Sequence, residues 1–148
     1  MLFLGIWDRA MPRRKYLRVI NGLDAVEKFL EEYKRRIYRY NSLIRDAGFY
    51  LKPLHIVSRQ VANGQRTYYY IGRYWWRVVY AGKAGKTSRV KWIYVGREKP
   101  PELAGYPDPP SHPIAGLRFS VDGRDVIIDR RVYEKYRWVF EGYTVVEE

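Results

Sequence analysis

Residues 66–96 carry nine aromatic side chains and seven basic ones, with no acidic residue among them. Aromatic and β-branched residues at this density predict β-strands, and the polar segment 82–87 between two aromatic runs predicts a hairpin loop. Successive side chains of a strand point to opposite faces, so the stretch also predicts which residues share a surface. A fold that contains this hairpin must cover one of its two faces.

Alternation divides the first strand into an uncharged face and a face that carries arginine. We expect the uncharged face to turn to the core, because burying an unpaired charge is costly. The uncharged face holds Tyr68, Tyr70, Tyr74, Trp76, Val78 and Tyr80. The predicted outward face holds Tyr69, Arg73, Trp75 and Arg77, with Arg89 and Lys91 from the second strand.

Guanidinium groups around an indole suit a polyanion that carries flat bases. Cations on the outward face would contact phosphates, Trp75 and Tyr69 would stack on bases, and the hairpin tip would reach a neighbouring phosphate. The alternative is a solvated face whose arginine stems cover aromatic surface. The candidate nucleic-acid-binding residues are Tyr69, Arg73, Trp75, Arg77, Lys83, Lys86, Arg89 and Lys91.

The net charge of +12 is unevenly distributed along the 148 residues. Residues 1–46 hold eleven basic and six acidic side chains, residues 47–97 hold ten and none, and residues 98–148 hold seven and ten. A concentrated positive field favours an anionic partner such as nucleic acid.

A single amphipathic helix is predicted over residues 23–47, where apolar positions recur with alternating spacings of three and four. Asn21 or Asp24 can cap its start, and Gly48 can end it. The seam suits either a coiled-coil homodimer or a helix that lies on the sheet, and the second interpretation explains what covers the hairpin. The seam residues are Leu23, Val26, Leu30, Tyr33, Ile37, Tyr40 and Ile44.

The remaining pattern predicts an α+β fold in one domain, 1–148, with an antiparallel sheet, the long helix across one face and a smaller C-terminal βα lobe. Two possible lobes, 1–97 and 116–148, are joined by the loop 98–115, which holds six of the eight prolines. The lobe 1–97 would contain a strand, the long helix and a three-stranded basic meander.

Shorter elements are predicted before the long helix and before the central hairpin. We expect a strand at 2–7 and a basic arm or solvated loop at 9–18. A further strand at 54–61 precedes a turn at Asn63-Gly64.

In the C-terminal lobe, a hairpin turns at Asp122-Gly123, and Asp129 caps a short helix at about 130–141. A closing strand follows at 143–146.

Two tests for chemistry give negative predictions. Gly85-Lys86-Thr87 lacks the first glycine of a phosphate-binding loop and precedes a strand rather than a helix. Asp122, Asp125 and Asp129 suggest a divalent-metal nuclease, but a turn and a helix cap explain two of them. We therefore predict no catalytic residue, metal or cofactor, with a metal-dependent nuclease as the enzymatic alternative.

Cellular context is predicted from what the sequence lacks. It has no apolar run long enough to span a membrane, and its apolar start meets Asp8 too soon for a signal peptide. We therefore expect a cytoplasmic protein. Because no cysteine is present, it has no disulfides and no thiolate metal sites. Abundant arginine, tyrosine and glutamate also fit a thermophile.

The central hairpin resembles basic β-hairpin modules of uncharacterised archaeal proteins and of proteins of mobile elements. The resemblance is carried by Tyr68-Tyr69-Tyr70, Gly85-Lys86, Arg89, Tyr94-Val95-Gly96-Arg97 and Pro100. This chain departs from that pattern in Trp75-Trp76 and in its long acidic C-terminal part. The resemblance implies association with DNA and no activity.

These observations predict a non-catalytic nucleic-acid-binding protein, with DNA favoured over RNA. The alternative is a structural or assembly component, ribosome-associated or in a virion, whose aromatic residues form a protein interface.

Overall fold

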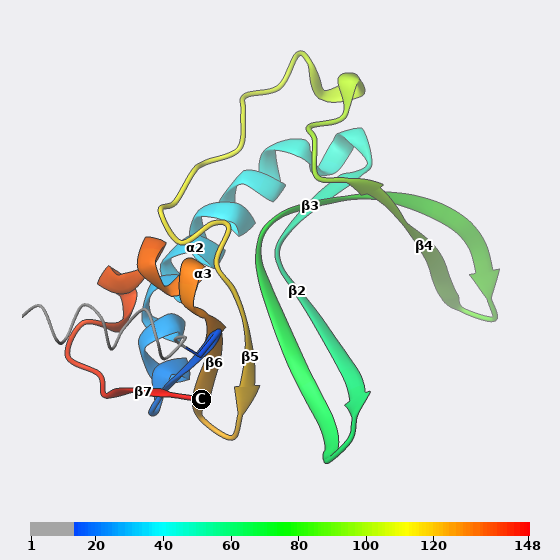
Figure 1. The fold of residues 1–148 in the computed structure, drawn as a ribbon. Coiled ribbons are helices and arrows are strands. Elements are labelled where there is room, and N and C mark those ends of the chain that lie inside the picture. Colours follow the sequence, from blue (N-terminus) through cyan, green and yellow to red (C-terminus); the bar gives the residue numbers. More distant parts are fainter. Residues whose placement is uncertain (1–13) are drawn as a thin grey trace, which may run out of the picture.

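The computed structural model describes residues 14–148, which form one antiparallel sheet of seven strands with a long helix across one face (Figure 1). The predicted α+β class is therefore confirmed. Helix α2 spans Gly22–Ile44 and continues into the 3-10 turn η1, Arg45–Ala47, close to the predicted bounds. The strand predicted at residues 2–7 lies outside the described residues.

A single long strand, β3, joins the parts of the sheet. The strand order is β2-β3-β5-β6-β1-β7, and β4 also pairs with β3. Strand β5 pairs with the start of β3, and β4 pairs with its end. The β2–β3 and β3–β4 hairpins, which share β3, diverge where β3 bends (Figure 1). The strands are β1 (Tyr16–Val19), β2 (Phe49–Val61), β3 (Gly64–Ala84), β4 (Thr87–Gly96), β5 (Arg118–Asp122), β6 (Asp125–Asp129) and β7 (Val145–Glu147).

The seam of α2 packs on the chain's own sheet, and each of its seven residues is at most 5% exposed. The Tyr33 hydroxyl donates to the Gly72 carbonyl of β3 at 2.8 Å. The side-chain amide of Asn41 donates to the Leu51 carbonyl at 2.9 Å and accepts from the Leu51 N–H at 2.8 Å. These contacts leave no exposed seam for a coiled-coil dimer.

The face of β3 that meets α2 is the opposite of the predicted one. Ile71 and Trp75 are 2% and 1% exposed, and the edge of the Trp75 ring meets the Tyr40 ring of α2. The uncharged face points away from the helix. The prediction that the uncharged face turns to the core is therefore wrong.

The two arginines on the helix side of β3 explain this error. Arg73 and Arg77 flank Trp75, and neither side chain is buried. Arg73 donates to the Pro110 carbonyl at 3.2 Å, and Arg77 donates to the Glu102 carboxylate at 2.6 Å. Since both arginines have partners at the margin of the core, their face carries no buried unpaired charge.

The proline-rich loop 98–115 packs along α2. Leu103 and Ile114 of this loop are completely buried, and the Tyr40 hydroxyl donates to the Pro107 carbonyl at 2.7 Å. The loop also contains the 3-10 turn η2 (Pro101–Leu103) and leads directly into β5, which pairs with β3 in the same sheet.

The C-terminal helix is shorter than predicted: α3 spans Arg130–Lys135 and is followed by the 3-10 turn η3, Arg137–Phe140. Asp129 caps α3 as predicted, because its carboxylate accepts from the Arg131 N–H at 2.8 Å. Among residues 14–148, no helix combines the length and apolar character that a membrane crossing requires.

Strand β1 overlaps the end of the segment 9–18, which was predicted to be an arm or a loop, and it pairs with both β6 and β7. Arg18 on β1 donates to the carboxylates of Asp125 and Glu148, at 2.9 and 2.8 Å. Its partners come from the far end of the chain, so a basic local sequence forms an interior strand of the sheet.

This cluster predicts a loss of stability in acid. The Asn21 N–H and the Arg18 guanidinium lower the pKa of Asp125, and Arg18 lowers that of Glu148. Carboxyl groups with a lowered folded-state pKa stabilise the fold above their unfolded pKa of about 4, and this stabilisation is lost as the pH falls through the folded value. We expect urea denaturation to show a falling free energy of unfolding between about pH 5 and pH 2.

The control for this acid effect is Arg18→Met, which keeps an unbranched side chain without the charge. Its stability should depend less steeply on pH in the same range, because Glu148 loses its main partner. An unchanged pH dependence in this variant would contradict the assignment.

Candidate nucleic-acid interface

The sheet surface that points away from α2 is aromatic, and we call it the aromatic face. Trp92 and Tyr94 on β4 are 43% and 48% exposed, and the other rings are partly exposed or exposed. The face consists of Tyr50 and His55 from β2, Tyr68, Tyr70, Tyr74 and Trp76 from β3, and Trp92 and Tyr94 from β4.

Ring contacts connect most of this surface. The Trp76 ring lies 5.2 Å from the Tyr94 ring and 6.5 Å from the Trp92 ring, measured between centroids. Around the bend of β3, the His55 ring lies 5.5 Å from that of Tyr74. Flat surfaces arranged in this way can each accept a base by stacking.

A pocket of about 290 Å³ opens among His55, Tyr74, Trp76 and Tyr94. All four lining side chains are rings, and its position between β2 and β4 places it near the middle of the aromatic face. Burial raises the pKa of the Tyr74 hydroxyl above its usual value. A planar, uncharged group is the ligand that such walls suit.

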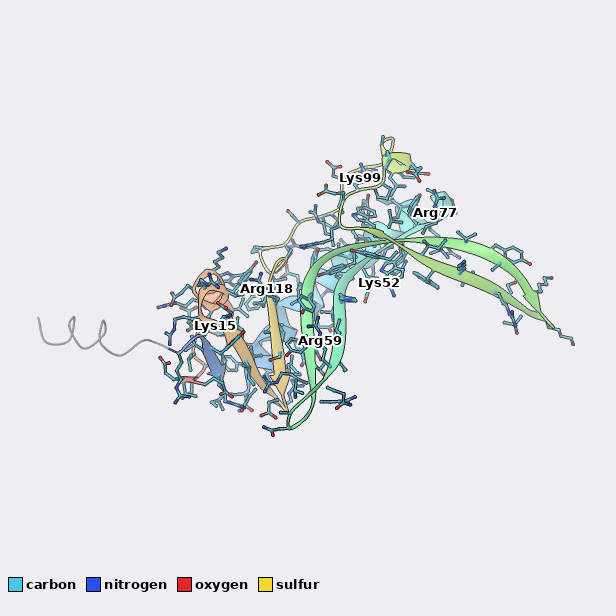
Figure 2. The ribbon with its side chains drawn as sticks, turned by 45° about the vertical axis from the view of Figure 1, so that its right-hand side comes forward. Lys15, Lys52, Arg59, Arg77, Lys99 and Arg118 are labelled. Carbon is cyan, nitrogen blue, oxygen red and sulfur yellow. The ribbon has the colours of Figure 1, made fainter. Side chains whose placement is uncertain are left out.

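Basic side chains stand among these rings. The Lys52 ammonium lies 4.7 Å from the Trp76 centroid and 5.0 Å from that of Trp92. The Arg59 guanidinium lies over Tyr68 at 5.3 Å. Figure 2 shows Lys52 and Arg59 along β2, and Arg77 where the β3–β4 hairpin leaves the body.

Five cations belong to this surface by register or ring contact, and we call them the basic rim. In the described part of the chain, none of them has a carboxylate oxygen within 4.0 Å. Among the ten cations of residues 47–97, Arg77 alone has such a partner within residues 14–148. The basic rim consists of Lys52, Arg59, Arg66, Arg97 and Arg118.

The predicted site residues do not form one surface. Trp75 is in the core, and the Tyr69 ring packs against the core and stacks on Phe119, with centroids 5.2 Å apart. Arg73 and Arg77 are held at the margin of the core, as described above. The other four are exposed on the projecting β3–β4 hairpin: Lys83, Lys86, Arg89 and Lys91.

The aromatic face was therefore missed as a site, although alternation had grouped most of its residues correctly. One available signal was the type of residue on each side of β3. Tyr68, Tyr70 and Tyr74 have hydroxyls that water can solvate, whereas the opposite side offers Ile71 and Trp75 to a core. Lys52 and His55 lack any such signal, because their place depends on how β2 pairs with β3.

Two of the aspartates considered for a metal site, and the buried His112, have structural roles. Arg18 bonds both Asp122 and Asp125, at 3.1 and 2.9 Å. His112 lies in the proline-rich loop, where its ring accepts from the Ile114 N–H and contacts the Glu32 carboxylate. Within residues 14–148, no group of three or more His, Cys, Asp or Glu side chains is placed to hold a metal ion.

No protein-family model matches the chain, and neither does any curated protein or solved structure.

Proposed function

We propose that this protein is a non-catalytic nucleic-acid-binding protein that holds a single strand on the aromatic face. The observation that carries the proposal is the coincidence of exposed rings with five cations that lack carboxylate partners in the described chain. Base–aromatic stacking contributes about 1–3 kcal/mol per base, and unpaired cations attract the phosphates between the bases.

The geometry favours a single strand over a duplex on this surface. Base faces are available for stacking only where they are not already stacked in a helix. The ring-lined pocket at His55 and Tyr74 also suits one unstacked base, with Lys52 and Arg97 near it for phosphates.

The test is the affinity for a labelled single strand, measured by fluorescence anisotropy over a range of salt concentrations. If the five cations of the basic rim each neutralise one phosphate, the slope of log K against log salt should be about −3.5 for a single strand. A flat dependence would contradict the proposal.

A second candidate function is that of a structural or assembly component. It is favoured by exposed aliphatic side chains on the β3–β4 hairpin, which a protein partner could cover: Val79, Val90, Ile93 and Val95. Light scattering without nucleic acid separates the two, because tight self-association together with no affinity for single strands would support assembly.

A further inference from the structure

The hairpin of β3 and β4 projects from the body as a two-stranded ribbon, which we call the arm (residues 78–95). The last residue of β3 that pairs with β2 is Arg77, so in the described structure only β4 pairs with β3 beyond it. At about 3.4 Å per residue, the β3 part of the arm is roughly 20–25 Å long. Residues 85–95 are all exposed, and the ribbon points away from the rest of the sheet (Figures 1 and 2).

The arm is positively charged and has no compensating group of its own. Residues 47–97 contain no acidic side chain, and within residues 14–148 none of the arm's cations has a carboxylate partner. The four exposed cations of the arm are Lys83, Lys86, Arg89 and Lys91. Their charge complements a polyanion.

Aliphatic side chains lie beside these cations. Val79 is directly opposite Lys91 in the ribbon, and Ile93 is two residues further along β4, so the three share a face. Both aliphatic side chains are exposed. A surface of this kind can contact phosphates and also the apolar edge of a base pair, such as a thymine methyl group.

The shape of the arm matches a groove of duplex DNA. The major groove of B-form DNA is about 12 Å wide and admits a two-stranded β-ribbon. The major groove of A-form RNA is too deep and narrow for protein side chains to read. A free basic ribbon with aliphatic contacts therefore suits a DNA duplex better than an RNA duplex.

We infer that the protein recognises a junction between single-stranded and duplex DNA, with the strand on the aromatic face and the duplex on the arm. The inference rests on the proposed function, because it assigns the second half of the same ligand. Trp92 and Tyr94 lie on β4 within the arm, on the face opposite to that of Lys91 and Ile93, so the same hairpin carries parts of both surfaces. Two linked contacts raise the affinity of one ligand above that of either part.

The experiment compares three labelled DNA ligands on the full chain by fluorescence anisotropy. They are a single strand of about 12 nucleotides, a blunt duplex, and the same strand joined to that duplex. We expect the junction to bind about tenfold more tightly than the single strand. An equal affinity of the single strand and the junction would overturn the inference and leave the proposed function standing. No binding of the single strand would overturn the proposed function itself.

A variant localises the effect to the arm. Replacing its four exposed cations by alanine should reduce the gain in affinity that the duplex adds to less than about twofold. The affinity for the single strand alone should fall by no more than about threefold. The charge-matched control replaces four exposed cations of α2 and α3 and should keep the full gain: Lys28, Arg35, Arg39 and Lys135. An equal loss of gain in both variants would overturn the role of the arm.

Two further outcomes would overturn the inference. An RNA duplex extension that adds as much affinity as the DNA extension would contradict docking in the major groove. A change of oligomeric state in the arm variant, measured by light scattering, would instead make the arm an interface between copies of the protein.

Discussion

Replacing Trp75 by alanine is expected to lower the free energy of unfolding by about 3–5 kcal/mol. Trp75 is the largest side chain that is fully buried in the described structure, and it lies opposite the buried Leu51 in the ladder of β2 and β3. Its ring also meets Tyr40 of α2, so the indole joins helix and sheet. The alanine variant would leave a cavity at this junction.

The measurement is urea denaturation followed by far-ultraviolet circular dichroism, which does not depend on tryptophan emission. Trp75→Phe is the conservative control and should lower the free energy of unfolding much less. A phenyl ring refills most of the space, and the Trp75 indole N–H has no hydrogen-bond partner within the described residues.

The neighbouring residue provides a test of which face is buried. Trp76→Ala should destabilise the protein less than Trp75→Ala, since the Trp76 ring lies on the partly exposed aromatic face. The reverse order of the two losses would show that the sheet presents its other side to the helix.

Local patterns were sufficient to predict the long helix and, to within one residue, the hairpin turns, which lie at 62–63 and 123–124. The spacing of apolar residues placed the helix face correctly, because every seam position has to be buried at once. Gly64 and Gly123 adopt positive φ angles at the hairpin turns, a conformation that glycine favours.

The orientation of β3 could not be derived from alternation alone. Either face of β3 could pack against the core, and which face is buried depends on where its charged residues have partners. Glu102 and Pro110 supply those partners from the loop 98–115, which follows β3 only after β4. Their position was not available from the pattern of β3.

The prediction for the residues of β1 failed for a related reason. Residues 14–18 include three basic side chains and have no strong alternation, so the local sequence favours a solvated segment. The strand exists because β6 and β7 supply both hydrogen-bonded neighbours and the carboxylates that Arg18 bonds. Elements that rely on distant charge partners are the hardest to predict from one sequence.

Replacing both Trp76 and Trp92 by alanine is expected to weaken the binding of a single strand by about 100-fold. The two rings lie on adjacent strands, and the Lys52 ammonium lies over both of them. The variant would remove two stacking platforms together with the surface that positions this cation. Since the rings contact each other, the double variant should not equal the sum of the single variants.

The measurement is anisotropy with the labelled single strand at one fixed salt concentration, with circular dichroism to establish that the variants are folded. Trp138→Ala is the matched control, because Trp138 is also exposed but packs on Phe29 of α2, away from the aromatic face. It should leave the affinity unchanged, whereas Trp76→Phe with Trp92→Phe should retain much of it, since phenyl rings still stack. If the double alanine variant stays folded and binds as tightly as the unmodified protein, bases do not stack on the aromatic face.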